Sequence, residues 1–312
     1  MPADARVPAD ARLPAEASPT RAAGASGTLS PAEITAAAVA SFDRAPDERL
    51  RLLVQRLVEH LHAFAVDTAL TEQEWAAAVA FVTAAGQACT PERQELILLS
   101  DVLGLSMLVD QLNHDVPATA TESTVLGPFY VPGSPMRPMG ASIVEQEGSG
   151  DPMLVSGTVR STDGSPVGGA VLDVWQNASN RMYAVQDPGQ PAENLRGRFQ
   201  TRGDGRFWFW SVRPTDYTIP DDGPVGRLLR ATGRHPWRPG HLHLMVSAPG
   251  HRPVTTHFFD DQSPYLGSDA VFGVKPSLLC HLVPHEGSEP GSPDGYDGTW
   301  YSVERDVVLV RA

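Results

Sequence analysis

The period of the hydrophobic pattern changes once along the chain, near Pro117, and this change constrains the fold most. Before it, a helical spacing of three to four residues links Leu50, Leu53, Val54, Leu57, Leu61 and Phe64. After it, glycine and proline become frequent, and short alternating runs separated by Asp-Gly turns are typical of antiparallel strands. The sequence therefore predicts an α+β protein, in which an N-terminal all-helical domain precedes a mostly antiparallel β-sandwich.

Three start signals divide the helical region. Ser30 with Glu33, and Thr71 with Glu74, have the spacing of capping boxes, in which each side chain satisfies a free backbone N–H of the other. A third predicted helix opens at Thr90-Pro91 and runs through Leu96, Leu99, Val102, Leu103 and Met107.

The composition of the segments predicts where the domains begin and end. Residues 1–28 consist mainly of Ala, Pro, Arg, Asp and Glu and are expected to form a disordered tail, because they cannot bury enough apolar surface to offset the entropy of ordering. The predicted helical domain is 29–116 and the predicted sandwich is 151–312. The linking stretch 117–150 is too apolar for a plain linker and is expected to pack near the active site.

Charge and composition exclude several classes of protein. The net charge of −13 over 312 residues argues against a nucleic-acid-binding surface. No run approaches 18 apolar residues, so no membrane span is expected, and the N-terminus lacks the apolar core of a signal peptide. A cytoplasmic protein is therefore expected. The two cysteines, Cys89 and Cys280, are interpreted as free thiols, with a single disulfide as the alternative.

Four side chains are candidates for a metal site. His241 and His243 lie two residues apart on a predicted strand, so both imidazoles point to one face while Leu242 points into the core. Tyr183 and Tyr217 lie upstream in turn-rich sequence. A free tyrosine keeps its proton up to about pH 10, but a strongly Lewis-acidic ion such as Fe(III) can displace that proton. If the four side chains converge, the chain is a ferric enzyme.

Taken one at a time, these residues have plainer interpretations. A His-x-His pair on a strand is more often a hydrogen-bonded core or surface pair than a metal site. A single tyrosine in a β-rich domain is nearly always a structural aromatic. Spacing alone leaves these alternatives open, and it also leaves Arg238, three residues before His241, as either a surface cation or a charge held over a site.

Longer segments resolve this choice by resemblance. Residues 230–243 (RATGRHPWRPGHLH) resemble the iron-binding signature of the intradiol ring-cleavage dioxygenases, and 173–183 and 217–226 resemble its two tyrosine segments. Within that family the chain is most similar to hydroxyquinol 1,2-dioxygenases, through segments 98–110, 122–129, 194–199 and 268–275. The resemblance covers about 30–310. Its departures from the family pattern are Gly240 in place of Ala, Asp216 and Thr218 in place of prolines, and His257 in place of a frequent Gln.

The resemblance implies a ligand set and a reaction. One Fe(III) per subunit is expected on Tyr183, Tyr217, His241 and His243, with Arg238 as a catalytic cation. Tyr217 is expected to be catalytic as well, as the ligand that leaves iron when substrate binds. It lies in a loop-like stretch, whereas Tyr183 follows a strand and should be held more firmly. The family cleaves an aromatic diol with O2 and is dimeric through its helical domain, in some members with bound lipid, so a homodimer is expected here.

The family also implies a substrate pocket. Matching positions are Leu98, Asp101, Val125, Gly127, Pro128, Phe129, Ile219, Pro220, Arg238 and Val271. An acidic side chain in an apolar pocket is costly without a partner, and the third hydroxyl of hydroxyquinol (benzene-1,2,4-triol) would be such a partner for Asp101. This favours cleavage of hydroxyquinol to 3-hydroxy-cis,cis-muconate or maleylacetate. Asp101 capping a backbone turn or pairing with an arginine is the alternative.

Other functions remain open at this point. A catechol or chlorocatechol 1,2-dioxygenase would share the iron site and differ in the pocket. A zinc hydrolase on a β scaffold could use His241 and His243 alone, and a transthyretin-like binding module would hold no metal.

Overall fold

The computed structural model describes residues 29–90, 93–287, 289, 291, 293 and 296–312, and the tail expected at 1–28 lies outside them. The chain divides into two compact units, residues 1–77 and 78–312. The division falls within a helix, so the domain limits expected at 116 and 150 stay predictions. No helix in the described part is long and apolar enough to cross a membrane.

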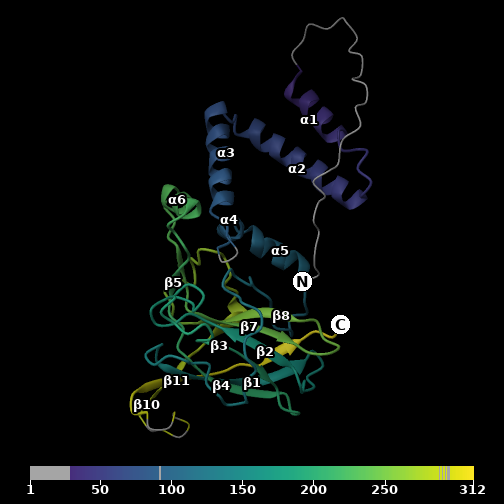
Figure 1. Cartoon of the computed structure of the whole chain (residues 1–312). Coiled ribbons are helices and arrows are strands. Elements are labelled where there is room, and N and C mark those ends of the chain that lie inside the picture. The colour runs from purple at the N-terminus through teal and green to yellow at the C-terminus, as the bar shows by residue number, and fades with distance from the viewer. Residues whose placement is uncertain (1–28, 91–92, 288, 290, 292, 294–295) are drawn as a thin grey trace, which may run out of the picture. The chain divides into compact units, whose positions relative to one another are not determined.

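The first unit is helical (Figure 1). Its elements are α1 (Pro31–Ala40), α2 (Glu48–Asp67) and the start of α3 (Glu72–Gln87). α1 and α2 pack on each other, and Thr35 of α1 lies 2.9 Å from Nδ1 of His62 on α2. The predicted apolar face of α2 nevertheless points to solvent, since its side chains are 51% to 57% exposed at Leu50, Leu53, Leu57, Leu61 and Phe64.

Both predicted capping boxes are confirmed. The backbone N–H of Ser30 donates to the Glu33 carboxylate at 2.8 Å, and the Glu33 N–H donates to the Ser30 hydroxyl at 3.3 Å. Thr71 and Glu74 make the same reciprocal pair at 2.9 and 3.2 Å. These bonds satisfy backbone donors that a helix start otherwise leaves free.

The third helix was predicted as one element, and this prediction is wrong. The structure has two helices there, α4 (Glu95–Val102) and α5 (Leu105–Asn113). Gly104 separates them at φ +75°, a left-handed conformation that glycine adopts at little cost. Leu98 and Asp101, both predicted pocket residues, lie on α4 before this break.

Two sheets build the second unit. The first has the order β10–β11–β1–β12, with β4 on the free side of β1, and its strands are β1 (Pro152–Ser161), β4 (Arg206–Val212), β10 (Val283–Glu286), β11 (Thr299–Glu304) and β12 (Val307–Leu309). The second has the order β3–β2–β7–β8–β9, and its strands are β2 (Val171–Trp175), β3 (Arg196–Gln200), β7 (His241–Ser247), β8 (Val254–Asp260) and β9 (Leu279–Cys280). Pairing is mostly antiparallel, as predicted, but β1 runs parallel to β11 and β12, and β8 runs parallel to β9.

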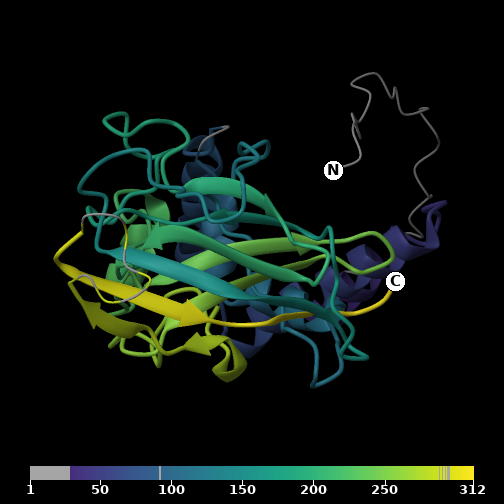
Figure 2. The same ribbon diagram turned by 90° about the horizontal axis from the view of Figure 1, so that it is seen from below.

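The remaining elements lie near one end of the sheets. They are the two-stranded ribbon β5 (Tyr217–Thr218) and β6 (Trp237–Arg238), the helix α6 (Pro224–Ala231) between them in sequence, and the 3₁₀ turn η1 (Pro276–Leu278). Figure 2 shows the sheets layered over each other.

The space between the sheets is the core. β1 and β4 contribute Val155, Phe207 and Phe209, and β2 and β7 contribute Leu172 and Leu244, all fully or almost fully buried. This confirms a sandwich. Cys280 belongs to the same core, and Cys89 is half-buried; both are free thiols, as expected.

The stretch 117–150 contains no helix or ladder strand but is tied to the strands by backbone bonds. Thr124 N–H donates to Thr255 O on β8 at 2.9 Å, and Ile143 N–H donates to Trp210 O on β4 at 2.9 Å. The segment Val125–Phe129 is thereby held beside β7, with a Gly127 Cβ position only 3.5 Å from the His243 ring.

Candidate active site

The two histidines of β7 meet as predicted from their spacing. His241 and His243 share one face of the strand, while Leu242 and Leu244 enter the core on the other. Their Nε2 atoms are 3.1 Å apart, and each residue is 1% exposed. Nδ1 of His241 lies 2.7 Å from the carbonyl oxygen of Pro239. A carbonyl only accepts, so Nδ1 carries the proton and Nε2 presents a lone pair.

Burial keeps these rings neutral. It lowers the pKa of His241 to about 3, and the positive charge of Arg238 acts in the same direction. Burial, with the charges of His241 and Arg238, also lowers the pKa of His243 well below its usual value. Neutral imidazoles with a free lone pair are the form that binds a metal ion.

The side chains of Tyr183 and Tyr217 both lie beside these two histidines. The Tyr183 hydroxyl is 2.9 Å from His243 Nε2, and the rings of Tyr183 and Tyr217 meet edge to face at 5.5 Å. Both side chains are 2% exposed. Burial and the nearby Tyr217 raise the pKa of Tyr183 well above its ordinary value, so the phenolate requires a strong positive charge beside it.

The backbone around the tyrosines differs from the expectation. Tyr217 does not lie in a loop but on β5, where it pairs directly with Arg238 of β6. Tyr183 lies in the irregular segment after β2, and its ring stacks on Phe129 with centroids 4.6 Å apart. Asp216 explains part of this order, because its carboxylate accepts from Gly240 N–H at 2.8 Å and so ties the Tyr217 strand to the turn before His241.

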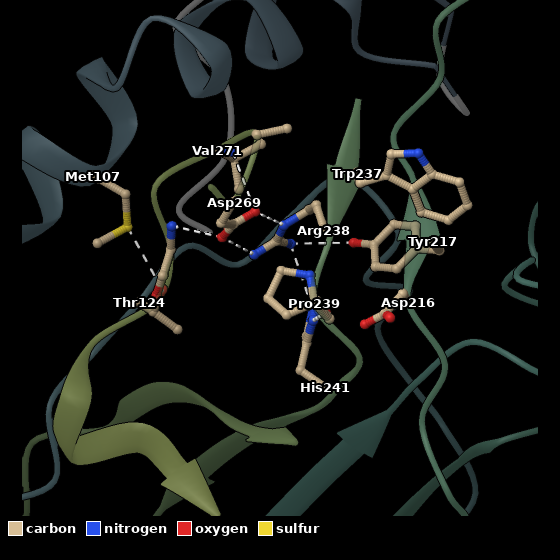
Figure 3. A network of polar contacts seen from close by, with 12 residues as sticks. Met107, Thr124, Asp216, Tyr217, Trp237, Arg238, Pro239, His241, Asp269 and Val271 are labelled. Atoms are coloured by element: carbon tan, nitrogen blue, oxygen red, sulfur yellow. Dashed lines mark hydrogen bonds and ion pairs between the residues drawn. The ribbon is translucent and has the colours of Figure 1, made fainter. Parts of the chain in front are cut away.

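Arg238 is buried at this centre (Figure 3). Its Nη1 donates to the Tyr217 hydroxyl at 3.1 Å and lies 3.4 Å from His241 Nε2. Its Nε and Nη2 donate to the carboxylate of Asp269 at 2.9 and 3.3 Å. Burial alone would lower the pKa of Arg238, but the negative charge of Asp269 outweighs it and keeps the guanidinium charged. Sequence reasoning missed Asp269 as a site residue, although it lies in segment 268–275, which carried part of the resemblance.

A third buried histidine joins the first two. His257 lies on β8 directly opposite His243, its ring stacks on His241 at 4.4 Å, and the three rings offer nitrogens within 4.8 Å of one another. Burial and the neighbouring histidines lower its pKa well below the usual value. Neither of its ring nitrogens reaches hydrogen-bonding geometry with a partner among the described residues. The sequence marked His257 only as a departure from the family pattern; its place opposite His243 needs the β7–β8 register.

The predicted pocket residues divide between two neighbouring cavities and a buried cluster. A cavity of about 520 Å³ is lined by Leu98, Pro128, Phe129, Ile219 and Pro220, and one of about 600 Å³ is lined by Asp101, Val125 and Gly127. Val271 lines neither of these two but packs in the same apolar cluster as Leu98, Val125 and Ile219. The strip 125–129 therefore contributes to both cavities and lies beside His243.

Asp101 is the acidic residue among the predicted pocket residues. It is 4% exposed on α4, and burial raises the pKa of its carboxyl, while Ser106 and the charge of Arg238 oppose the rise. α4 is fixed at its start by Glu95, which accepts from the Val225 N–H of α6 at 2.9 Å and pairs with Arg93 at 2.9 Å. Asp101 is thus a buried acid held on a fixed helix.

Two family models match this chain in succession. The family described as "Catechol dioxygenase N terminus" matches residues 47–121, and the one described as "Dioxygenase" matches residues 125–298. The hydroxyquinol 1,2-dioxygenase of Rhizobium sp. (strain MTP-10005) is 51% identical over 85% of this chain and 90% of its own length. The chain belongs to the intradiol ring-cleavage dioxygenases.

Other members of the family agree with the fold. The 6-chlorohydroxyquinol 1,2-dioxygenase of Cupriavidus pinatubonensis is 48% identical over 88% of this chain and 96% of its own. The crystal structure of a hydroxyquinol 1,2-dioxygenase from Pseudomonas putida DLL-E4 is 47% identical and superposes with a TM-score of 0.84 over 90% of this chain and 99% of its own. The catechol 1,2-dioxygenase of Pseudomonas arvilla C-1 is 28% identical and superposes with a TM-score of 0.79, over 90% of this chain and 92% of its own.

Membership of the family settles the class of reaction. Intradiol dioxygenases are non-haem iron enzymes, so the zinc hydrolase and the metal-free binding module left open by the sequence are excluded. The donor set fits iron, since two phenol oxygens and two neutral imidazole nitrogens converge in a buried centre where the cation Arg238 is already paired with Asp269.

Proposed function

We propose that this dioxygenase cleaves hydroxyquinol with O2 to 3-hydroxy-cis,cis-muconate or maleylacetate, as a step in aromatic catabolism. The observation that carries this substrate is Asp101, a buried acid on α4 that lines a cavity together with Val125 and Gly127, beside the apolar cluster of Leu98, Val125 and Ile219. A third ring hydroxyl gives such a carboxyl a hydrogen-bond partner that catechol lacks. The names of the Rhizobium and Pseudomonas putida relatives support the same substrate.

The proposed metal is one Fe(III) per subunit, held by Tyr183, Tyr217, His241 and His243. Two phenolates and two neutral imidazoles suit a hard trivalent ion, and phenolates formed on binding would offset much of its charge. When bound, ferric iron supplies Lewis-acid chemistry to the coordinated diol.

Tyr217 is proposed to accept a proton during the reaction, and Arg238 is proposed to stabilise negative charge. With iron bound, the Tyr217 oxygen would accept a proton from the diol, since a doubly deprotonated diol would add negative charge that a neutral tyrosine would offset. The Nη1 donor of Arg238, already 3.1 Å from that oxygen, is in place to bind it afterwards. The same guanidinium stabilises negative charge developing on the substrate, which a fixed cation does well in a water-poor site.

Pro128 and Phe129 close the wall between the metal ligands and the cavity of about 520 Å³. Phe129 also stacks on Tyr183 and so holds that ligand in place while Tyr217 moves. The residues Leu98, Ile219, Pro220, Val271, Val125 and Gly127 are proposed to contact the ring.

A homodimer through the helical domain is proposed as well. Its support is the apolar face of α2, which the described residues leave exposed, and lipid bound at that interface would cover further apolar surface.

The substrate is tested by comparing specificity constants. The unmodified enzyme should prefer hydroxyquinol to catechol, and Asp101→Ala and Asp101→Asn should reduce that preference by about ten- to a hundredfold, the effect of one hydrogen bond to a charged group. Asp110→Asn is a matched control, since Asp110 lines the same cavity of about 600 Å³ but is paired with Lys275 at 3.3 Å.

The competing candidate is cleavage of catechol or a chlorocatechol, favoured by the similarity to the solved catechol 1,2-dioxygenase. A higher specificity constant for catechol in the unmodified enzyme would establish that candidate instead.

A further inference from the structure

The guanidinium of Arg238 has two distinct edges. Nη1 faces the metal ligands, at 3.1 Å from the Tyr217 oxygen and 3.4 Å from His241 Nε2. The opposite edge, Nε and Nη2, binds both oxygens of Asp269. The pair is 2% exposed on each side, so water cannot share these donors or orient the side chain. The direction in which Nη1 points is therefore determined by its contact with Asp269.

Asp269 is itself held by backbone donors. Its two oxygens accept from Val271 N–H at 3.3 Å and from Gly273 N–H at 2.8 Å. The carbonyl of Gly273 in turn accepts from the Thr124 hydroxyl at 2.8 Å, next to the pocket residue Val125. Figure 3 shows this chain of contacts running from Thr124 to Tyr217. The carboxylate is thus fixed by the loop that also carries the pocket residue Val271.

The loop leaves no space behind the guanidinium. A Cβ added at Gly273 would lie 2.8 Å from Nη2 of Arg238 and 3.2 Å from Oδ2 of Asp269. Any side chain there would push the guanidinium toward the metal ligands or break its contact with Asp269. Glycine at this position therefore permits the close packing of loop and cation.

We propose that Asp269 is a positioning residue of the reaction: it holds the Arg238 guanidinium against Tyr217 and His241. Among the described residues, the Asp269 carboxylate binds Arg238 and the backbone of Val271 and Gly273, and it makes no hydrogen bond to the four proposed ligands, so it acts on them through Arg238. The proposal rests on the proposed function for the roles of Tyr217 and Arg238 and does not depend on which diol is the substrate.

The test is Asp269→Asn in the iron-loaded enzyme. Iron content should remain near that of the unmodified enzyme, because no ligand is changed. The visible tyrosinate-to-iron absorption should shift, since the Tyr217 oxygen loses its donor, and kcat should fall by about tenfold or more with a smaller change in KM.

Asp260→Asn is the matched control. Asp260 is also buried and binds an arginine through two nitrogens, those of Arg213 at 3.1 and 2.8 Å, but this pair does not face the metal ligands. It should lower thermal stability without shifting the visible spectrum. If Asp269→Asn behaves like Asp260→Asn, with spectrum and kcat unchanged within twofold, the positioning role is wrong.

A second variant keeps the test decisive if Asp269→Asn does not fold. Gly273→Ala retains the carboxylate but crowds Nη2, and it should produce a spectral shift and a kcat loss with iron retained; an unchanged spectrum would overturn the proposal. A wrong assignment of the substrate can be distinguished from a wrong positioning role for Asp269. An unmodified enzyme that prefers catechol leaves the spectral and kcat tests intact, since they are then measured with catechol.

Discussion

The two units of this chain differ in whether their apolar side chains are buried. In the helical unit, no residue of α1 or α2 is buried, and the most regular apolar face of the sequence lies in solvent. In the sheet unit, large side chains such as Phe199, Phe207 and Phe209 are buried, and so are the polar groups of the active site. The sheet unit therefore buries both its core and the candidate active site, whereas the helical unit presents an apolar surface that the described residues do not cover.

This contrast predicts where mutations act. Changes on β5 to β8 should alter the metal site directly, and changes on the exposed face of α2 should alter assembly while leaving that site intact.

The largest effect is expected at a proposed metal ligand on β7. His243→Ala removes the nitrogen that meets Tyr183 at 2.9 Å and His241 at 3.1 Å, so iron bound per subunit should fall at least about tenfold and turnover should be lost. His285→Ala is the control, because His285 on β10 stacks on Trp300 at 4.0 Å, remote from the ligand set in the fold. Elemental analysis and the visible spectrum measure both. Full iron in His243→Ala would remove it from the ligand set.

The next largest effect is expected at Tyr217. Tyr217→Phe should retain appreciable iron, because three ligands remain, but kcat should fall by about 10² to 10⁴, the contribution typical of a proton acceptor in the reaction. Resonance Raman spectra of the anaerobic substrate complex, compared between Tyr217→Phe and Tyr183→Phe, identify which phenolate is lost on binding. Loss of the Tyr183 modes would reverse the roles of the two tyrosines.

A change of pH is expected to have a smaller effect, on the stability of the metal-free protein. The pKa values of His241, His243 and His257 are lowered by burial, to about 3 for His241. Each ring then binds its proton more readily in the unfolded chain, so the free energy of unfolding rises with pH from the folded pKa up to about 6.5. Metal-free protein should lose stability as pH falls from 7 to 5, by up to about 1.4 kcal/mol per pH unit for each histidine.

Urea unfolding of the metal-free protein at several pH values checks this. His257→Gln should reduce the slope by the share of one histidine while iron binding persists, because it leaves the four proposed ligands in place. An unchanged slope would mean that His257 titrates alike in the folded and unfolded chain.

Much of this site could be predicted from local sequence. The period of two placed His241 and His243 on one face, and the capping boxes located the starts of α1 and α3, because both rest on rules that act over a few residues. The break at Gly104 was missed because an isolated glycine in a helical pattern is often tolerated.

Long-range contacts were beyond such reasoning. His257 reaches the site only through the β7–β8 register, and Asp269 only through a loop that returns to β6, 31 residues from Arg238. The strand at Tyr217 depends on pairing with Arg238 across α6, which no pattern within Asp216–Pro220 reveals. The local sequence therefore does not predict these contacts. Resemblance to the family supplied the proposed ligand set, and the structure supplied the residues that orient it.

The smallest effect on the metal site is expected from the helical unit. Leu57→Asp places a charge in the centre of the exposed face of α2, where Leu57 is 57% exposed, so it should cost the single chain little. In a homodimer built on this face the same charge would be buried without a partner, and the dimer should dissociate at micromolar concentration. Arg56→Ala on the same helix makes the same change in net charge and removes only a surface ion pair with Glu59, so it should remain dimeric. Sedimentation compares the two variants, and iron content and kcat should stay within about twofold of the unmodified enzyme in both. A Leu57→Asp protein that stays dimeric would move the interface elsewhere, and one that loses iron would show that the two units are not independent.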